Sequence, residues 1–577
     1  MAYCRSLPIL VSLQNILFGG DPINRFKLVN GCDPNKTFRD NVLANRSATA
    51  AEADITLKDL SAPFLMKDAE KAASVIREVM NENGKILLYS DYDCDGWGCC
   101  VIFDNAMKML GYDNYVLHSN KRSQGYGMKT EVLEEILTNH PDIRLVVTAD
   151  NGITCLTEAA FLKSQGIRLV VTDHHLPVSS GALPEAEAVV DPHQNGETCP
   201  YREFCGTGVL FKVLWLLLKT SGKTARDLST LLDVVALATV ADVVAITGEN
   251  RAIVKAGLVL INGKARPQWE EFIRLKPGNS KEIRSSDLGF YIGPCINAVS
   301  RMSGDIQPAV RVFTDPQHCD ISIEQMLSIN QSRKDEQREM SQKAFDMLGG
   351  NPADHFICQR MAQCGEGVIG LVAGQIQTKY YRPTIVFTLV SWKSWKGSAR
   401  SIPGVHMKNM LDDINAKHPG VITTYGGHEQ AAGLTIPRTA FDEFRQAAED
   451  YCTKLDESVF TEPVVYDWEL KNLNELPALL QEQLSLEPYG HCFPEPLIHF
   501  AFKPSAARTF KDDTHLELHS GPAKVLCWNI GDLLAGHEAT DIAWVDCVCT
   551  LAGPFELYAA PEYLSITFAD GSSTDGE

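Results

Sequence analysis

Two clusters of acidic and imidazole side chains stand out, because groups of this kind bind divalent metal ions. Asp91-Tyr-Asp93-Cys-Asp95-Gly96 gathers three carboxylates, and Asp173-His174-His175 puts two imidazoles beside another. Carboxylates in one place repel one another unless a positive charge lies among them. Imidazole combined with carboxylate suits Mn, Zn, Fe or Mg ions, and Mn and Mg are favoured where oxygen ligands dominate. These motifs predict a metal centre.

Both clusters, and two further aspartates, directly follow short apolar runs. The four runs precede Asp91, Asp150, Asp173 and Asp191, and they span residues 85–90, 144–149, 168–172 and 188–190. Short runs rich in Val, Ile and Leu indicate strands buried on both faces, and helical patterns such as residues 155–165 separate the first three. Alternating strands and helices predict an open parallel α/β sheet, whose ligands bind beyond the carboxyl ends of the strands. We therefore expect the aspartates to converge on one crevice.

A simpler interpretation is that these aspartates cap helices and form turns, as Asp often does after a strand. That interpretation suits a single aspartate. It suits three clusters at successive strand ends, with two adjacent histidines, much less well. We therefore prefer the metal centre.

The bulk properties favour a cytoplasmic enzyme of several domains. At roughly 150 residues per domain, 577 residues predict three to four domains. The net charge of −20 argues against coating nucleic acid by bulk electrostatics but allows a local basic groove. The 17 cysteines contain no C-x-x-C pair, which predicts reduced thiols rather than a zinc knuckle. No run of about 18 apolar residues suggests a membrane span.

The chain divides into six predicted parts. An N-terminal extension, with a docking helix between Leu7 and Phe18, precedes an aspartate-bearing α/β domain and a helical connector that ends in a long charged helix. A second α/β domain follows, then short alternating runs that predict a small β-barrel or sandwich, and finally a polar acidic tail predicted to be disordered. The predicted boundaries are 1–69, 70–250, 251–352, 353–460, 461–569 and 570–577.

The second α/β domain contains a window without acidic residues. Residues 367–411 hold six cations and no Asp or Glu, where the average composition would place about six acids. The cations are Lys379, Arg382, Lys393, Lys396, Arg400 and Lys408, and they alternate with Tyr380, Tyr381, Trp392 and Trp395. Cations among aromatic rings favour single-stranded nucleic acid, although a solvated surface over core aromatics would give the same composition. Gly397-Ser398-Ala-Arg400-Ser401 and Gly426-Gly427-His428 offer donors for a phosphate.

Ordered motifs make the chain similar to the DHH/DHHA1 phosphoesterase family, and within it to the single-strand-specific exonucleases. Beyond those quoted above, the motifs are Thr148-Ala-Asp-Asn-Gly-Ile153, Cys205-Gly-Thr-Gly208, Thr239-Val-Ala-Asp-Val-Val244, Thr247-Gly-Glu-Asn-Arg251, Ile296-Asn-Ala-Val-Ser-Arg301, Gly367-Val-Ile-Gly370 and Glu487-Pro-Tyr-Gly490. The resemblance covers residues 70–500 well and the β-rich end loosely.

The resemblance implies a parallel-sheet DHH domain and an α/β DHHA1 domain joined by a long helix, then a β-rich OB-like domain. It implies two Mn²⁺ or Mg²⁺ ions held by Asp93, Asp95, Asp150, His174 and Asp242, with Asp91 and His175 as alternate or supporting ligands. It assigns substrate contacts to Arg301 and, across a cleft, to Ser398, Arg400, Ser401, Gly426, Gly427 and His428. Lys121, Arg122 and Tyr126 match a further substrate-binding motif, in which Lys121 stands where the family usually has Arg.

The resemblance implies hydrolysis of single-stranded DNA from 5′ to 3′, in recombination, repair or replication. The expected setting is the bacterial cytoplasm, or a host cytoplasm if a phage encodes this divergent chain. We expect a monomer, with a single-strand-binding protein or a helicase as candidate partner. Two alternatives stay open: a short-oligonucleotide phosphodiesterase or polyphosphatase, and a non-catalytic replication scaffold. The extra C-terminal residues argue against the first, and the intact ligand set against the second.

Overall fold

The computed structural model describes residues 26–178, 180–278, 280–349, 354–511, 514–528, 534, 536–569 and 571–573. These residues form two compact units, each discontinuous in sequence. Unit one contains residues 48–332 and 487–494, and unit two contains the described parts of residues 26–47, 333–486 and 495–573. The predicted docking helix between Leu7 and Phe18 lies outside the described residues, and so does most of the predicted acidic tail.

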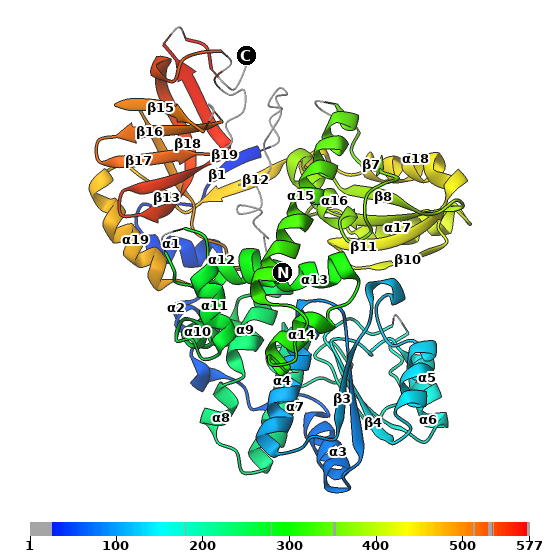
Figure 1. The fold of residues 1–577 in the computed structure, drawn as a ribbon. Coiled ribbons are helices and arrows are strands. Elements are labelled where there is room, and N and C mark those ends of the chain that lie inside the picture. The colour runs from blue at the N-terminus through cyan, green and yellow to red at the C-terminus, as the bar shows by residue number, and fades with distance from the viewer. Residues whose placement is uncertain are drawn as a thin grey trace. The chain divides into compact units, whose positions relative to one another are not determined.

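Unit one is built on a five-stranded, fully parallel sheet in the order β3-β2-β4-β5-β6. Figure 1 labels β3 and β4 of this sheet. Its strands are β2 (Lys85–Ser90), β3 (Tyr115–Ser119), β4 (Ile143–Ala149), β5 (Arg168–Thr172) and β6 (Ala188–Val190). The predicted parallel sheet is thus confirmed. The edge strand β3 was not predicted, because only the last of its five residues is buried and it has no continuous apolar run.

Helices cover both faces of this sheet (Figure 1). On one face, side chains such as Leu88 and Val147 pack against α3 (Ala69–Asn81), α4 (Cys94–Leu110) and α7 (Gly206–Thr220). On the other, Leu87 and Val146 pack against α5 (Thr130–Asn139) and α6 (Leu156–Ser164). Because side chains alternate along a strand, a sheet covered twice needs the near-continuous apolar runs seen in the sequence.

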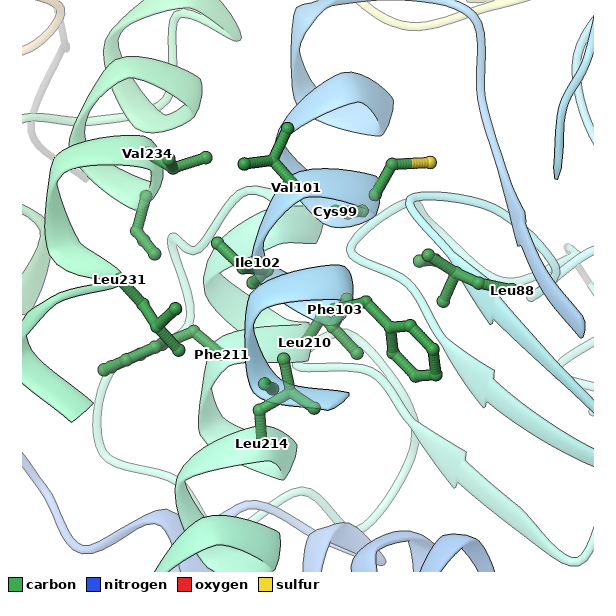
Figure 2. Close-up of a cluster of buried hydrophobic side chains, with 14 of the residues drawn as sticks. Leu88, Cys99, Val101, Ile102, Phe103, Leu210, Phe211, Leu214, Leu231 and Val234 are labelled. Atoms are coloured by element: carbon green, nitrogen blue, oxygen red, sulfur yellow. The ribbon is translucent and has the colours of Figure 1, made fainter. Parts of the chain in front are cut away.

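Helices α4, α7 and α9 (Leu232–Ala241) share one core beside the sheet (Figure 2). Phe103 from α4, Leu210 from α7 and Val234 from α9 are buried there. This packing fixes the N-termini of α4 and α7 and the C-terminus of α9. The three helix ends carry Asp93, the Gly206 amide and Asp242 respectively.

The remaining helices of unit one continue the predicted helical region. They are α8 (Ala225–Ser229), α10 (Gly248–Asn262), α11 (Pro267–Leu275), α12 (Ser285–Asp287), α13 (Gly293–Ser303) and α14 (Gln307–Thr314), and a π-helical turn, Leu288–Ile292, precedes α13. The predicted long charged helix is α15 (Ile323–Leu348), which runs from residues of unit one into residues of unit two.

Unit two begins with a mixed sheet in the order β10-β11-β9-β8-β7. Its strands are β7 (Ile357–Arg360), β8 (Thr384–Ser391), β9 (Ser394–Arg400), β10 (Thr424–Gly427) and β11 (Ala431–Pro437), and only β7 and β8 pair in parallel. Helices α16 (Ile369–Tyr380), α17 (Met407–Lys417) and α18 (Phe441–Cys452) accompany the sheet. This is the second α/β domain expected from the sequence.

The C-terminal part of unit two is rich in strands, as predicted. Seven strands follow the order β13-β14-β18-β19-β17-β16-β15. They are β13 (Trp468–Glu469), β14 (Ile498–Phe502), β15 (Ala506–Phe510), β16 (His515–Ser520), β17 (Ala523–Cys527), β18 (Ile542–Gly553) and β19 (Glu556–Phe568), and α19 (Leu476–Ser485) lies between β13 and β14 in the chain. Among the described residues no pairing closes β13 on β15, so an OB-like barrel stays a prediction.

Two segments belong to units that are distant from them in sequence. In unit two, β1 (Phe26–Asn30) pairs in parallel with β12 (Glu462–Tyr466), and α1 (Phe38–Asn45) follows it in the chain. The next helix, α2 (Ala50–Ala53), belongs to unit one. In unit one, the buried Arg251 donates to the carbonyls of Pro488 and Glu487 at 2.7 and 3.3 Å. The exact domain boundaries given above stay predictions.

Every helix in the described part of the chain is too short or too polar to span a membrane. Among the cysteines that the structure describes, fifteen are free thiols, and twelve of these are buried. Cys492 is disulfide-bonded, so the prediction of reduced thiols is wrong for that residue.

Candidate metal centre

The first acidic cluster is fixed by helix N-termini. Asp93 caps α4, and its Oδ1 accepts from the amides of Asp95 and Gly96 at 2.9 and 3.2 Å. The buried Asp95 caps α7 in turn, because its two carboxylate oxygens accept from the amides of Gly206 and Thr207 at 2.6 and 2.8 Å. Helix N-termini stabilise negative charge, so both carboxylates have a fixed position before any ion binds.

Two further carboxylates come from a strand end and a helix end. Asp150 directly follows β4 and has a left-handed backbone with φ of 61°. Gly206 permits this close approach, since a Cβ on it would lie 2.5 Å from Cβ of Asp150. Asp242 is the C-cap of α9. A carboxylate at a helix C-terminus is electrostatically unfavourable, which indicates a role outside helix stability.

His174 joins these carboxylates. Its Nε2 lies 3.2 Å from Oδ1 of Asp150, 3.7 Å from Oδ2 of Asp242 and 3.9 Å from Oδ2 of Asp95. Yet Nε2 is buried and has no hydrogen-bond partner among the described residues. Burial and the neighbouring His175 lower the pKa of His174 to about 4, so the ring is neutral at pH 7 and can donate a lone pair.

The site has an excess of buried negative charge. Burial, followed by the charges of Asp95 and Asp93, raises the pKa of Asp150 and of Asp242 well above the usual range. Burial and the charge of Asp93 also raise the pKa of Asp91, whose Oδ1 has no hydrogen-bond partner within the described chain. Carboxylates crowded in this way are most easily ionised when a cation lies among them.

Three groups of ligand atoms have the spacing that a metal ion requires. They are Asp150 with His174 and His175, Asp95 with His174 and Asp242, and Asp91 with Asp93 and Asp150, each with atoms within 4.8 Å of one another. The unsatisfied Nε2 of His174, the unsatisfied Oδ1 of Asp91 and the oxygen-rich donor set all fit Mn²⁺ or Mg²⁺. Asp150 and His174 each belong to two groups.

His175 is held by a buried carboxylate and a tyrosine. Its Nδ1 lies 2.8 Å from Oδ1 of Asp173 and 2.9 Å from the hydroxyl of Tyr126. Burial disfavours a charged ring, but the charge and hydrogen bond of Asp173 outweigh it and raise the pKa of His175 to about 9. In the metal-free protein the adjacent histidines therefore differ, with His174 neutral and His175 charged at pH 7. The structure thus places Tyr126, predicted to bind substrate, beside a histidine of the site.

Of the predicted cations in unit one, Arg122 is placed most clearly near the site. Its Nε donates to Oγ of Ser300 at 3.1 Å, and its guanidinium lies 4.6 Å from the centre of the Tyr92 ring. Its charge also lowers the pKa of Asp91 and Asp93 against their net upward shift. Lys121 is exposed at the start of the same turn. Arg301 lies in the last turn of α13, which approaches the site through a bond from the Cys94 amide to Asn297.

The predicted phosphate-binding residues of unit two cluster on neighbouring strands. Strand β11 lies between β9 and β10, and its Gly433 pairs with Ser398 of β9 on one side and with Gly426 of β10 on the other. Arg400 of β9 pairs with Ala431 of β11. The Arg400 guanidinium lies close to the start of α16, since a Cβ on Gly370 would be 2.8 Å from Oγ of Ser398 and 2.9 Å from Nη2 of Arg400. Gly427 and His428 continue this edge, whereas the hydroxyl of Ser401 is buried and donates to the Val405 carbonyl.

Arg400 lacks an acidic partner in the described part of the chain. Its Nη1 donates to the Ala399 carbonyl at 2.7 Å and to Oγ of Ser398 at 3.3 Å, and burial lowers its pKa. A buried guanidinium without a carboxylate is costly unless an anion completes it. Arg400, Ser398 and the N-terminus of α16 thus form an anion cradle, a name kept below for these three groups.

The structure corrects the expected aromatic and basic surface. Tyr380, Tyr381 and Trp395 are buried, so they belong to the core, and Trp392 is the exposed ring at 74%. Lys396 pairs with Glu366 at 2.6 Å and Lys408 with Asp412 at 2.5 Å. Both acids lie just outside the acid-free window, which is why the sequence count overstated the free positive charge.

Sequence reasoning missed the groups that orient the site. Asn297, Ser300 and the amides of Gly206 and Thr207 come from separate parts of the chain and contact the acidic cluster or Arg122. All four residues lie in quoted family motifs, Cys205–Gly208 and Ile296–Arg301, which are the signal that pointed to them. The roles assigned to individual site residues stay predictions, as does the cleft expected between the two sets of residues.

Known proteins share this arrangement. The N-terminal domain of the DHH family matches residues 85–239, and the DHHA1 domain matches residues 353–454. The chain is 33% identical over 478 residues to the single-stranded-DNA-specific exonuclease RecJ of Haemophilus influenzae, covering 78% of this chain and 81% of the relative. It is 30% identical over 478 residues to the Escherichia coli protein of the same name, covering 79% and 81%.

Solved structures agree in fold. RecJ of Thermus thermophilus in complex with Mn²⁺ aligns with a TM-score of 0.77 at 24% identity, over 93% of this chain and 79% of that one. An exonuclease RecJ bound to manganese aligns with a TM-score of 0.58 at 27% identity, over 69% and 98%.

A parallel-sheet unit with a cluster of Asp and His side chains, followed by a mixed-sheet domain, defines the DHH/DHHA1 class. The chain belongs to the RecJ family within that class.

Proposed function

We propose that this protein is a single-strand-specific exonuclease that hydrolyses the phosphodiester bonds of DNA from 5′ to 3′ with two divalent metal ions. The observation that carries the proposal is the set of three buried or half-buried groups of candidate ligands, which are linked through Asp150 and His174. One residue shared by two groups is the arrangement expected of a pair of ions bridged by a common ligand. The names of the relatives support DNA as substrate.

Bound at these ligands, two ions would polarise the scissile phosphate, lower the pKa of an attacking water and stabilise the leaving oxygen. The chain supplies the geometry. Asp93 and Asp95 are fixed by backbone amides, so the site needs little rearrangement. Arg122, placed by Ser300, provides a positive donor for the negative charge that grows on the phosphate, and Asp173 fixes the ring of His175.

The anion cradle of unit two would bind a phosphate of the same strand. A phosphate there replaces the missing acidic partner of Arg400 and accepts from Oγ of Ser398 and the first amides of α16. Exposed Trp392 with Lys393, whose Nζ lies 4.5 Å from the ring centre, adds a stacking surface. We propose that these groups give the enzyme its preference for a flexible single strand.

The test uses single-stranded oligonucleotides labelled at the 5′ or the 3′ end, with Mn²⁺, with Mg²⁺ and with chelator. Stepwise release of mononucleotides from the 5′ end, dependent on the metal and absent on blunt duplex, is the expected result. Asp150→Asn is the matched inactive variant. Release from the 3′ end, or cleavage confined to dinucleotides, would contradict the proposal and favour the short-oligonucleotide phosphodiesterase.

Other features stay proposals from the sequence. We propose action in the bacterial cytoplasm, or in a host cytoplasm for a phage gene, where single strands arise in replication and repair. A monomeric state and a partnership with a single-strand-binding protein or helicase complete the proposal. Analytical ultracentrifugation with and without such a protein tests both.

A further inference from the structure

Val243 has an unfavourable backbone and an exposed side chain, one residue after the candidate ligand Asp242. Its φ is 60°, and it is the only β-branched residue among the non-glycine residues with positive φ in the described chain. The residue is 61% exposed. A left-handed conformation costs about 1–2 kcal/mol for an ordinary L-residue and is rarest for β-branched ones. Folding alone does not explain a valine here.

Glycine would be the usual residue at this position. Val243 follows the C-cap of α9, and its amide donates to the Val240 carbonyl at 3.3 Å. That is the helix-ending position at which glycine is preferred. Lys264 ends α10 in the same way, with φ of 56° and a hydrogen bond from its amide to the Ile261 carbonyl. The comparison shows that the backbone needs the turn, whereas the isopropyl group of Val243 packs little against the protein.

A second exposed apolar group lies on the segment that packs against the end of α9. Phe290 is 46% exposed and belongs to the π-helical turn Leu288–Ile292. The turn and the start of α13 contact α9, since a Cβ on Gly289 would lie 3.4 Å from Cγ1 of Val240 and one on Gly293 would lie 2.9 Å from Cβ of Ala241. π-Helical turns are uncommon and often mark functional sites.

We infer that Val243 and Phe290 form an apolar shelf that contacts the base of the nucleotide whose phosphate lies at the metal centre. The inference rests on the proposed function and adds a specificity element to it. The ligands of the metal centre recognise only the phosphate, which is the same in every nucleotide and in other phosphoesters. An aliphatic group and an aromatic ring contact any base without reading its identity, which suits an enzyme that degrades all sequences.

The first test separates stability from activity. Val243→Gly relieves the backbone strain, so the melting temperature should rise by about 2 °C, although glycine also gains entropy in the unfolded chain. The same change should lower kcat/KM on single-stranded DNA by about tenfold, the loss expected for a contact with a base. Lys264→Gly is the matched control and should leave activity unchanged. A gain in stability with a loss of activity is not the result of a purely structural role.

The second test identifies the group that the shelf contacts. Substrates with a normal or an abasic 5′-terminal nucleotide are compared in the wild type, Val243→Gly, Phe290→Ala and the milder Phe290→Leu. For the wild type, kcat/KM should be about tenfold lower on the abasic substrate than on the normal one. For the variants the two substrates should differ little, because the change in the protein and the change in the substrate remove the same contact. Equal losses on both substrates in every variant would overturn the inference.

The two proposals fail in different ways. A wild-type protein that does not degrade single-stranded DNA would overturn the proposed function. An active wild type with an equally active Val243→Gly variant would overturn the shelf alone.

Discussion

Nε2 of His174 lies 3.2 Å from Oδ1 of Asp150, and the two atoms do not form a hydrogen bond. Their strands are neighbours, since Ala149 of β4 stands opposite Thr172 of β5. The residues that follow two paired parallel strands must meet at the same edge of the sheet. The pair is thus a direct product of strand order, and its geometry suits two ligands of one ion better than a donor and an acceptor.

Removal of either partner should abolish metal-dependent hydrolysis. We expect Asp150→Asn and His174→Ala to lower kcat by at least about a hundredfold and to weaken Mn²⁺ binding, because each removes a ligand shared by two groups. Calorimetric Mn²⁺ titration and circular dichroism would separate lost binding from lost folding. Glu134→Gln, an exposed carboxyl of α5, is the control. Full activity with normal ion binding in either variant would refute the ligand assignment.

Asp191 should make the metal-free protein less stable as the pH rises. Burial and the charge of Asp173 raise the pKa of Asp191 to about 8. A carboxyl with a raised folded-state pKa binds its proton more tightly in the folded state. Its contribution to the stability of the fold is therefore complete below pH 4 and is lost as the pH rises from about 4 to 8. In the presence of chelator, the free energy of unfolding of Asp191→Asn should therefore rise relative to that of the wild type by at least about 1 kcal/mol between pH 5 and pH 8. If the difference in unfolding free energy between the two proteins is the same at pH 5 and at pH 8, the prediction is wrong.

The anion cradle should tolerate no side chain at Gly370. A Cβ there meets Ser398 and Arg400 at under 3 Å, whereas a Cβ on Gly374, one turn later in α16, meets nothing within 4 Å. Gly370→Ala should raise KM on single-stranded DNA about tenfold. Gly374→Ala should leave KM unchanged and stabilise the protein by about 0.5–1 kcal/mol through helix propensity. Equal KM values in both variants would show that the cradle does not bind the strand.

Cations of the acid-free window should contribute unequally to binding. Arg400 has no acidic partner in the described chain, whereas Lys396 is paired with Glu366. We expect Arg400→Ala to reduce the slope of log K against log salt by about 1, and Lys396→Ala to change it little. The slope is measured by fluorescence anisotropy with an oligonucleotide and Asp150→Asn protein. A larger change for Lys396 would reverse the assignment.

The end point of a C-terminal deletion should decide whether unit one stays stable. Deletion of residues 495–577 keeps the 487–494 segment, whereas deletion of 463–577 removes the carbonyls that the buried Arg251 binds. The buried guanidinium would keep its bond to the Ala53 carbonyl but lose two acceptors, which costs several kcal/mol, so the longer deletion should melt at the lower temperature. The shorter deletion should still cleave short oligonucleotides and release fewer nucleotides per encounter on long ones. Equal melting temperatures would contradict this.

The apolar runs predicted β2, β4, β5 and β6, because the strands of a parallel sheet that is covered on both faces need apolar side chains at nearly every position. The same rule predicted that the aspartates after these strands lie at one edge of the sheet, whereas Asp242 ends a helix and was proposed as a ligand only through the family resemblance. The edge strand β3 was missed because its side chains are mostly half-buried. Asn297 and Ser300 were missed as supporting groups because only the packing of α13 brings them to the site.

Charge counting failed for a physical reason. A window of sequence has sharp ends, but a cation on β9 or α17 pairs with whatever carboxylate is nearest in space. Glu366 and Asp412 are each one residue outside the window, and both are paired to cations within it. The three buried aromatics show the same limit, because the cores on the two sides of one sheet use the rings that the sequence placed among the cations.

The path of the chain through unit one also constrains its evolution. Residues 487–494 return to this unit after more than 150 residues spent in the other. A recombination event that joined the first 332 residues to a foreign sequence would transfer an incomplete unit, in which the buried Arg251 lacks the Glu487 and Pro488 carbonyls. The two halves of the gene are therefore expected to be inherited together, and new combinations are expected to arise by insertion into loops or by addition at the ends.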